Sequence, residues 1–378
     1  EIENIEREFR ICSTNGLSLS KSFPASYGEI LKNFNEIYST SSNEECEKTH
    51  KKFKEKVTNN FHKKLITVGF QSGVNDLYLQ SLGKRYQANN NLNLTYNNVF
   101  SNLALKIKIT KDLEDNKYYF DESYASYKIN NTVFSIGRTS RWWSPSKQYS
   151  LILSNSARPS PGLEIRNFMP IEPKRKYLSF LGEINYEIFL NRLENNRTIP
   201  NALLFGNRVS IKPTDNFHIS LLRLAQFGGN ERPTDSKTIL NMILGRDNTS
   251  SSLSFEEQPG NQIAGFDLSY HLNDFIFYGQ LVGEDEAGLF PSRKIKLLGS
   301  SWSNEIRYIP LEISFDFIDT FSGINNYSYN HNLYKDGLRY YKFPIGASID
   351  ADSKSFATSI QAIINNTTLK ATINKIDL

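Results

Sequence analysis

The acidic run Glu284-Asp285-Glu286 is a candidate for catalysis or metal binding. Paired carboxylates can hydrolyse glycosidic bonds, and carboxylate oxygens are ligands that calcium prefers. Adjacent residues at a strand end point in opposite directions, so a working pair needs a carboxylate from another loop. We therefore favour a structural role, in which these acids pair with arginines of the loops.

The rest of the sequence lacks the short motifs of soluble enzymes. It contains no HExxH, no GxSxG, no phosphate-binding loop and no paired CxxC. His218 and His271 fall on the polar faces of predicted strands, where a hydrated structural histidine is more common than a base or a ligand. The sequence therefore predicts neither an enzyme nor a cofactor or metal.

Aromatic and planar polar side chains are interspersed in NNYSYNHNLYKDGLRYY, residues 325 to 341. Tyrosine rings can stack on sugar rings, and amide, carboxylate and guanidinium groups can bond sugar hydroxyls. An aromatic girdle at a membrane interface is the alternative for Tyr340 and Tyr341. The polysaccharide-binding candidates are Tyr329, Asn330, Tyr334, Asp336 and Arg339.

A second set of charged residues suits the fastening of loops to one another. Pairs of arginine with a carboxylate are bidentate and directional, so they fix loop geometry well. The predicted loop and lumen network consists of Arg158, Arg232, Arg246, Glu284, Asp285 and Glu286.

The composition bounds the kind of body that can position these residues. The chain has 378 residues, of which 39% are hydrophobic and 13% aromatic, and its formal net charge is +4. This mild positive excess, without a long basic run, gives no reason to expect nucleic acid as a partner. No stretch approaches the roughly 20 apolar residues of a transmembrane helix.

Residues 1 to 63 carry helical signals. Ser26 and Glu29 form a capping-box pattern, and apolar residues follow it at helical spacing. A second, highly charged segment has only a narrow apolar stripe, so we predict a small helical module that leans on a larger body. Cys12 and Cys46 both lie in this module, and the sequence leaves open whether they form a disulfide.

From residue 64 to residue 378 the hydrophobic period changes to two, which indicates strands. In IAGFDLSYHL, for example, Phe266 and Leu268 alternate with Asp267 and Ser269. The polar faces hold glycine, charge and histidine, as a hydrated lumen would. We predict an all-β fold, an antiparallel transmembrane β-barrel of about 16–18 strands.

Short connections alternate with long ones along this region. Asn273-Asp274, Asn365-Asn366 and 212–216 are candidate short turns, whereas 228–261, 284–292 and 320–353 are longer. Short turns on one side and long loops on the other are typical of outer-membrane barrels.

Trp142 and Trp143 stand side by side in RTSRWWSPSKQYS. Adjacent side chains of a strand point to opposite faces. We therefore expect one ring at the lipid interface and the other packed inward, near the rim that carries the short turns. This structural role is preferred over sugar binding.

Around the tryptophan pair the sequence resembles a known family. GRTSRWWSPSKQYSLILSNSARPSPG, FGGNERPTD, YGQLVGEDEAGLFPS and YSYNHNLYKDGLRYY follow one another as in the Wzi-type capsule-assembly proteins. The resemblance spans residues 138 to 352 and implies a barrel of about 18 strands, a periplasmic helical module and binding of capsular polysaccharide. Few residues follow Asp352, where the family has further strands, so we expect the chain to be incomplete.

These observations predict a surface lectin of the bacterial outer membrane that assists capsule assembly. The expected partners are capsular polysaccharide or exopolysaccharide and outer-membrane lipid, and the expected state is a monomer. A porin-like channel for small solutes is the alternative. Long loops that can fill the lumen favour the lectin.

Overall fold

The computed structural model describes residues 22–23, 65–72, 90–234, 260–284, 286–287, 290–291, 293–307, 309–325, 327–364 and 367–377. The predicted helical module of residues 1 to 63, with both cysteines, lies outside this part of the chain. The exception is the strand β1 (Ser22–Phe23).

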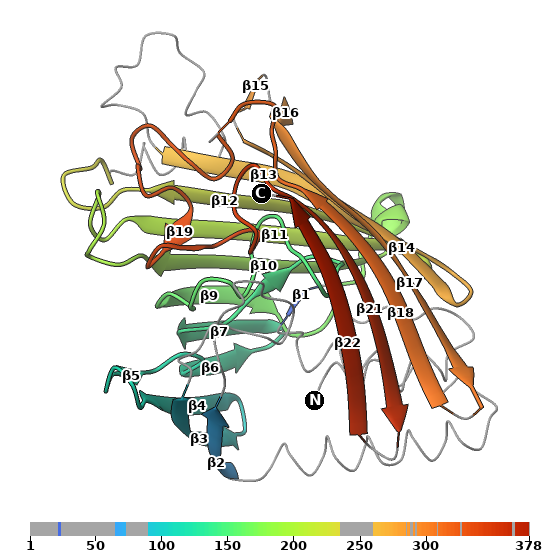
Figure 1. Ribbon diagram of the computed structural model, residues 1–378, viewed down its shortest axis with the longest axis horizontal. Coiled ribbons are helices and arrows are strands. Elements are labelled where there is room, and N and C mark those ends of the chain that lie inside the picture. The colour runs from blue at the N-terminus through green and yellow to red at the C-terminus, as the bar shows by residue number, and fades with distance from the viewer. Residues whose placement is uncertain are drawn as a thin grey trace.

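The described residues form one antiparallel sheet of 16 strands, which Figure 1 shows as a single strongly curved surface. Each strand pairs with its neighbours in chain order, except that short elements branch off or are skipped. Its strands are β2 (Leu65–Ser72), β3 (Asn90–Phe100), β4 (Leu103–Asp112), β5 (Tyr118–Tyr119), β6 (Tyr124–Ile129), β7 (Thr132–Gly137), β9 (Gly162–Asn167), β10 (Glu183–Arg192), β11 (Leu203–Thr214), β12 (Phe217–Phe227), β13 (Gly260–Leu272), β14 (Phe275–Glu284), β17 (Lys294–Ile306), β18 (Ile309–Asp319), β21 (Lys354–Ile364) and β22 (Thr367–Asp377).

Three two-stranded ribbons and one helical turn complete the described elements. They are β1 with β8 (Trp142–Trp143), β15 (Glu286–Ala287) with β16 (Phe290–Pro291), β19 (Arg339–Tyr340) with β20 (Phe343–Pro344), and the 3-10 helix η1 (Lys176–Leu181). Within the described ranges, no helix has the length and apolar character needed to span a membrane.

The sheet is built inside out compared with a water-soluble protein. Along β13, Phe266, Leu268 and Tyr270 are exposed, whereas the alternating Asp267 and Ser269 are buried. The same inversion recurs in β10, where Ile188 and Leu190 are exposed beside the buried Glu187. An apolar outer face and a polar inner face are what strands in a lipid bilayer require.

The connections follow the predicted rhythm with one exception, residues 168–182 between β9 and β10, which form a long connection at the end of the strands that carries the short turns. Asn273-Asp274 joins β13 to β14, and a short turn joins β11 to β12. The connections from β7 to β9, β10 to β11, β12 to β13, β14 to β17 and β18 to β21 are longer and, by the antiparallel order, all lie at the other end of the strands. Asn365-Asn366 falls between β21 and β22 but lies outside the described residues.

The described pairings run from β2 at one edge to β22 at the other and do not join these two strands. The prediction of an all-β antiparallel fold with about sixteen strands is therefore confirmed. A closed ring of strands is not shown by these pairings.

Candidate functional site

The tryptophan pair lies inside the curved sheet, not in its wall. Residues 138–161, here called the first inserted segment, leave the sheet at Gly137 and return at Gly162, which pair with each other. Trp142 and Trp143 pair with β1, and their exposed fractions are 1% and 0%. The prediction that one ring faces lipid is wrong, because protein covers both faces of this short strand.

Trp143 is fixed against the middle of strand β10. Its ring centroid lies 5.4 Å from that of Phe189, and its Nε1 donates to Glu187 Oε2 over 2.9 Å. Arg141 forms ion pairs with the buried Glu187 (2.9 Å) and with the buried Glu164. The buried charges therefore compensate one another. The two tryptophans lie away from the short-turn rim, where the sequence analysis had placed them.

The first inserted segment also reaches the opposite strands. Ser146 Oγ donates to Asp316 Oδ1 of β18 over 2.6 Å. Gln280 of β14 accepts from the backbone N–H of Leu151 over 2.7 Å and donates to the carbonyl of Trp143 over 2.7 Å. The segment is thus bonded to strands on both sides of the space that it occupies.

The second inserted segment, residues 320–353, joins β18 to β21 and packs on the first. Tyr329 has an exposed fraction of 0%, and its hydroxyl donates to the carbonyl of Leu151 over 2.7 Å. Tyr334 is 1% exposed, and its hydroxyl donates to the carbonyl of Gly228 over 3.1 Å. Neither ring has the exposure that stacking on a sugar requires, and both hold segments together.

The three polar candidates of the same motif make internal bonds as well. Arg339 forms a bidentate ion pair with Asp350, at 2.9 Å and 2.7 Å, and donates to Asn330 Oδ1 over 2.7 Å. Asp336 Oδ2 accepts the backbone N–H of Thr198 over 2.7 Å. Their contribution to sugar binding stays a prediction, whereas their part in holding the loops is visible.

The pKa of Asp336 reflects its loop contact. Burial raises it, but the hydrogen bonds from Thr198 and the charge of Arg197 outweigh burial and hold the pKa below its usual range. Asp336 is therefore a carboxylate at neutral pH that fastens the second inserted segment to the connection between β10 and β11.

Arg197 and Glu194, which the sequence did not single out, form the junction between these parts. Their side chains are buried and pair over 3.3 Å. Arg197 also donates to the carbonyls of Gly337 (3.1 Å) and Arg339 (3.0 Å). A loop sequence without a period gives no signal for the contacts with Gly337 and Arg339, because these partners are far away in the chain.

Of the predicted loop and lumen network, two arginines are described. Arg158 pairs with Asp121 over 2.8 Å and lies 3.4 Å above the ring of Tyr119. Arg232 lies beside the hydroxyl of Tyr334 and opposes the rise in the pKa of that tyrosine that burial causes. Arg246, Asp285 and the side chains of Glu284 and Glu286 lie outside the description.

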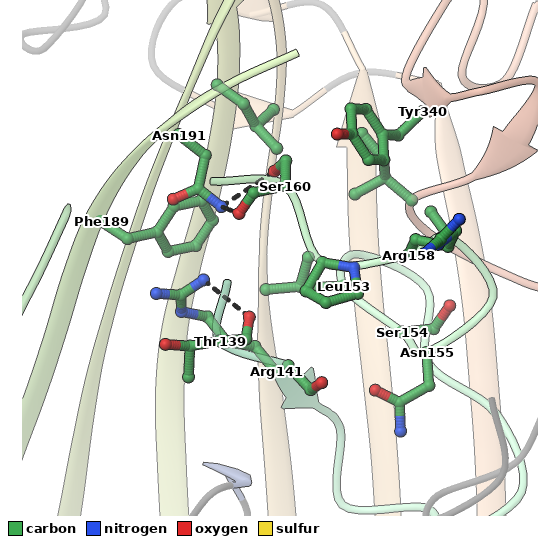
Figure 2. Close-up of a pocket in the computed structure, with 15 residues that line it drawn as sticks. Thr139, Arg141, Leu153, Ser154, Asn155, Arg158, Ser160, Phe189, Asn191 and Tyr340 are labelled. Carbon is green, nitrogen blue, oxygen red and sulfur yellow. Dashed lines mark hydrogen bonds between the residues drawn. The ribbon is translucent and has the colours of Figure 1, made fainter. Parts of the chain in front are cut away.

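A cavity of about 40 Å³, lined by polar and apolar side chains, lies where the first inserted segment meets β10 and Tyr340. Figure 2 shows Asn191 turned towards Ser160, to which its amide donates over 2.9 Å. A cavity of this size holds a few water molecules. A cavity of this volume does not enclose a sugar ring.

The hairpin β19–β20 places one of its two adjacent tyrosines at the protein surface and buries the other. Tyr340 is 3% exposed and its hydroxyl accepts from Arg138 over 3.3 Å, so it belongs to no lipid girdle. Tyr341, by contrast, is 54% exposed. The sequence analysis assigned the same alternative role to both tyrosines, because their neighbours in the chain do not distinguish them.

The antiparallel sheet has an apolar outer face and a polar inner face, and its long connections fold back against the inner face. These features are typical of outer-membrane β-proteins whose interior is filled by loops. The model of the family described as capsule assembly protein Wzi matches residues 29–373. This chain belongs to that family, as its motifs predicted.

One curated relative matches part of this chain. An uncharacterized 55.8 kDa protein in the cps region of Klebsiella pneumoniae is 29% identical over 232 residues, which are 58% of this chain and 45% of that protein. The chain therefore spans less than half the length of this curated relative.

One solved structure shares the fold. Escherichia coli Wzi, described as an outer-membrane protein involved in group 1 capsule assembly and a carbohydrate-binding β-barrel, has a TM-score of 0.82 and 23% identity, covering 99% of this chain and 83% of that one. An anion-selective porin from Comamonas acidovorans scores only 0.40 at 13% identity, covering 83% and 89%.

Proposed function

We propose that this chain is the body of a bacterial outer-membrane lectin, which holds capsular polysaccharide or exopolysaccharide at the cell surface and assists capsule assembly without catalysis. The sheet closes into a monomeric barrel, and the exposed apolar face contacts outer-membrane lipid. Family membership and the carbohydrate binding of the similar Escherichia coli protein support this proposal.

The observation that carries the proposal is the way in which both inserted segments are fastened. Tyr329 joins them to each other through Leu151, and Gln280 joins the first of them to the wall. Bonds of this kind prepare a rigid loop surface in advance, which lowers the entropic cost of binding.

The porin-like channel is the weaker candidate. The inner space that solutes would cross holds a continuous cluster of buried residues, among them Trp143, Tyr149 and Tyr329. A conducting protein keeps a water-filled passage there, so we expect very little ion current through the closed protein.

Two measurements on the full-length protein test the proposal. Purified protein in proteoliposomes is exposed to capsular polysaccharide from the bacterium that encodes it, and bound polymer is quantified. The same preparation is placed in a planar bilayer. Retained polymer with negligible conductance supports the lectin, whereas open-channel currents without polymer retention would refute it.

A further inference from the structure

Tyr341 is more exposed than the other tyrosines described in the second inserted segment. Tyr329, Tyr334 and Tyr340 are at most 3% exposed, and each hydroxyl has a partner within the protein. Tyr341 is 54% exposed. Its ring is the tyrosine ring of this segment that an external molecule can reach most fully.

The backbone beneath Tyr341 is held in a fixed position. Its N–H donates to Glu194 Oε1 over 3.1 Å, and Glu194 is paired with Arg197. Tyr340 packs edge-on against Tyr341 with ring centroids 4.7 Å apart. An exposed ring on a restrained backbone loses little freedom when a ligand stacks on it.

The turn that presents Tyr341 is unfavourable for the residues that occupy it. Tyr341 and Lys342 are the central residues of the β19–β20 hairpin, and their φ angles are 49° and 71°. Two consecutive positive φ angles define the type I′ turn, which favours Asn-Gly. A strained turn that displays a large ring suggests a function for the ring.

Lys342 adds a charge beside the ring. It is exposed, and within the described residues its ammonium group forms no ion pair or hydrogen bond. A cation beside an exposed aromatic ring suits a sugar that carries a carboxylate, because the ring covers an apolar sugar face while the ammonium group pairs with the acid.

We propose that the Tyr341-Lys342 turn is a binding subsite for an acidic sugar of the polymer, with a pyranose ring stacked on Tyr341 and its carboxylate paired with Lys342. This subsite rests on the proposed function, and it gives that function a location and a ligand class.

The test uses a double variant that keeps the turn. Replacing Tyr341→Asn together with Lys342→Gly installs the residues that a type I′ turn prefers, so the hairpin is retained while ring and charge are lost. Tyr341→Phe keeps the stacking face. Tyr118→Ala is the matched control, because Tyr118 is 59% exposed at the same end of the sheet and has Lys111 beside its ring.

Binding is measured on full-length protein, with heat-modifiable migration on gels as the check of folding. The probes are the native capsular polysaccharide of the source bacterium and the same polymer after its carboxyl groups have been reduced to alcohols. We expect the double variant to bind native polymer about tenfold more weakly, the loss of one stacked ring and one ion pair. Tyr341→Phe and Tyr118→Ala should bind as the unmodified protein does.

The reduced polymer should bind the unmodified protein more weakly, and Lys342→Gln should then make no further difference. Equal binding of native polymer by the double variant and the unmodified protein would overturn the subsite and leave the lectin standing. Equal binding of native and reduced polymer would overturn the acidic ligand. Failure of the unmodified protein to bind any polymer would remove the lectin and the subsite together.

Discussion

Replacing Trp143 by Ala removes the side chain that joins the first inserted segment to the wall. The ring is 0% exposed and lies against Phe189. Truncating a buried Trp to Ala typically costs about 3–5 kcal/mol. This cost includes the lost N–H bond to Glu187. No cost for an unpaired buried charge is added, because Glu187 keeps its ion pair with Arg141. We take about 4 kcal/mol, which raises the undocked fraction of the segment roughly a thousandfold.

Hydrogen exchange measured by mass spectrometry on protein in liposomes can detect this change. The backbone N–H of residue 143 is bonded to the carbonyl of Leu153 over 3.0 Å, so peptides that cover 142–153 should lose most of their protection. Strands β12 and β13 keep their own ladder of hydrogen bonds and should exchange as before.

Trp143→Phe is the matched control, since it keeps an aromatic ring against Phe189 and loses the bonded N–H and only part of the ring volume. A hydrogen bond to a charged group contributes about 1.5–3 kcal/mol, so its effect should lie below that of Ala, which removes the whole ring as well. Unchanged protection of 142–153 in the Ala variant would refute the reasoning. Equal acceleration in β12 and β13 would show that segment and wall unfold together.

Three further perturbations address the second inserted segment. Asp336→Asn should weaken the bond to Thr198, which contributes about 1 kcal/mol. Because the pKa of Asp336 is lowered in the folded protein, the stabilisation by its carboxylate is complete above the unfolded pKa of ~3.9 and is lost as pH falls through the folded pKa. Acid should therefore increase proteolysis of the loop in the parent protein and not in the Asn variant. Arg339→Ala should lower loop stability by about 2 kcal/mol by breaking the bidentate pair with Asp350, and Lys should not restore it; equal urea dependence of loop proteolysis in both variants and the parent would contradict this. Gly346→Ala should cost about 1–3 kcal/mol, because its Cβ would lie 2.6 Å from a backbone oxygen of the first inserted segment; a urea midpoint equal to that of the parent would show that the two segments can separate freely.

The strands were predictable because their chemistry repeats every two residues. The alternation of Phe266 and Leu268 with Asp267 and Ser269 indicated a strand with one apolar and one polar face, and burial confirms both faces. Alternation does not reveal which face meets water, since a soluble sandwich alternates too. Glycine, charge and histidine on the polar faces favoured the lumen, and His271 is indeed 3% exposed on the inner side.

The inserted segments have no such repeat, so their positions depend on distant contacts. Arg339 and Tyr341 are neighbours in one motif, yet one is fastened to Asp350 and the other is 54% exposed. Trp142 and Trp143 form a short strand, as expected, but the strand pairs with β1 and Trp143 bonds to β10. Protein therefore surrounds Trp143 where the sequence alone left lipid as a possible neighbour. The sequence by itself determined the strands, their rhythm and the family, because local periods and collinear motifs are written in the order of residues. Which side chains fasten the segments and which ring remains at the surface was decided only by the tertiary structure. The segments have no repeat, and several of their partners are distant in the chain, as in the contact of Tyr329 with Leu151.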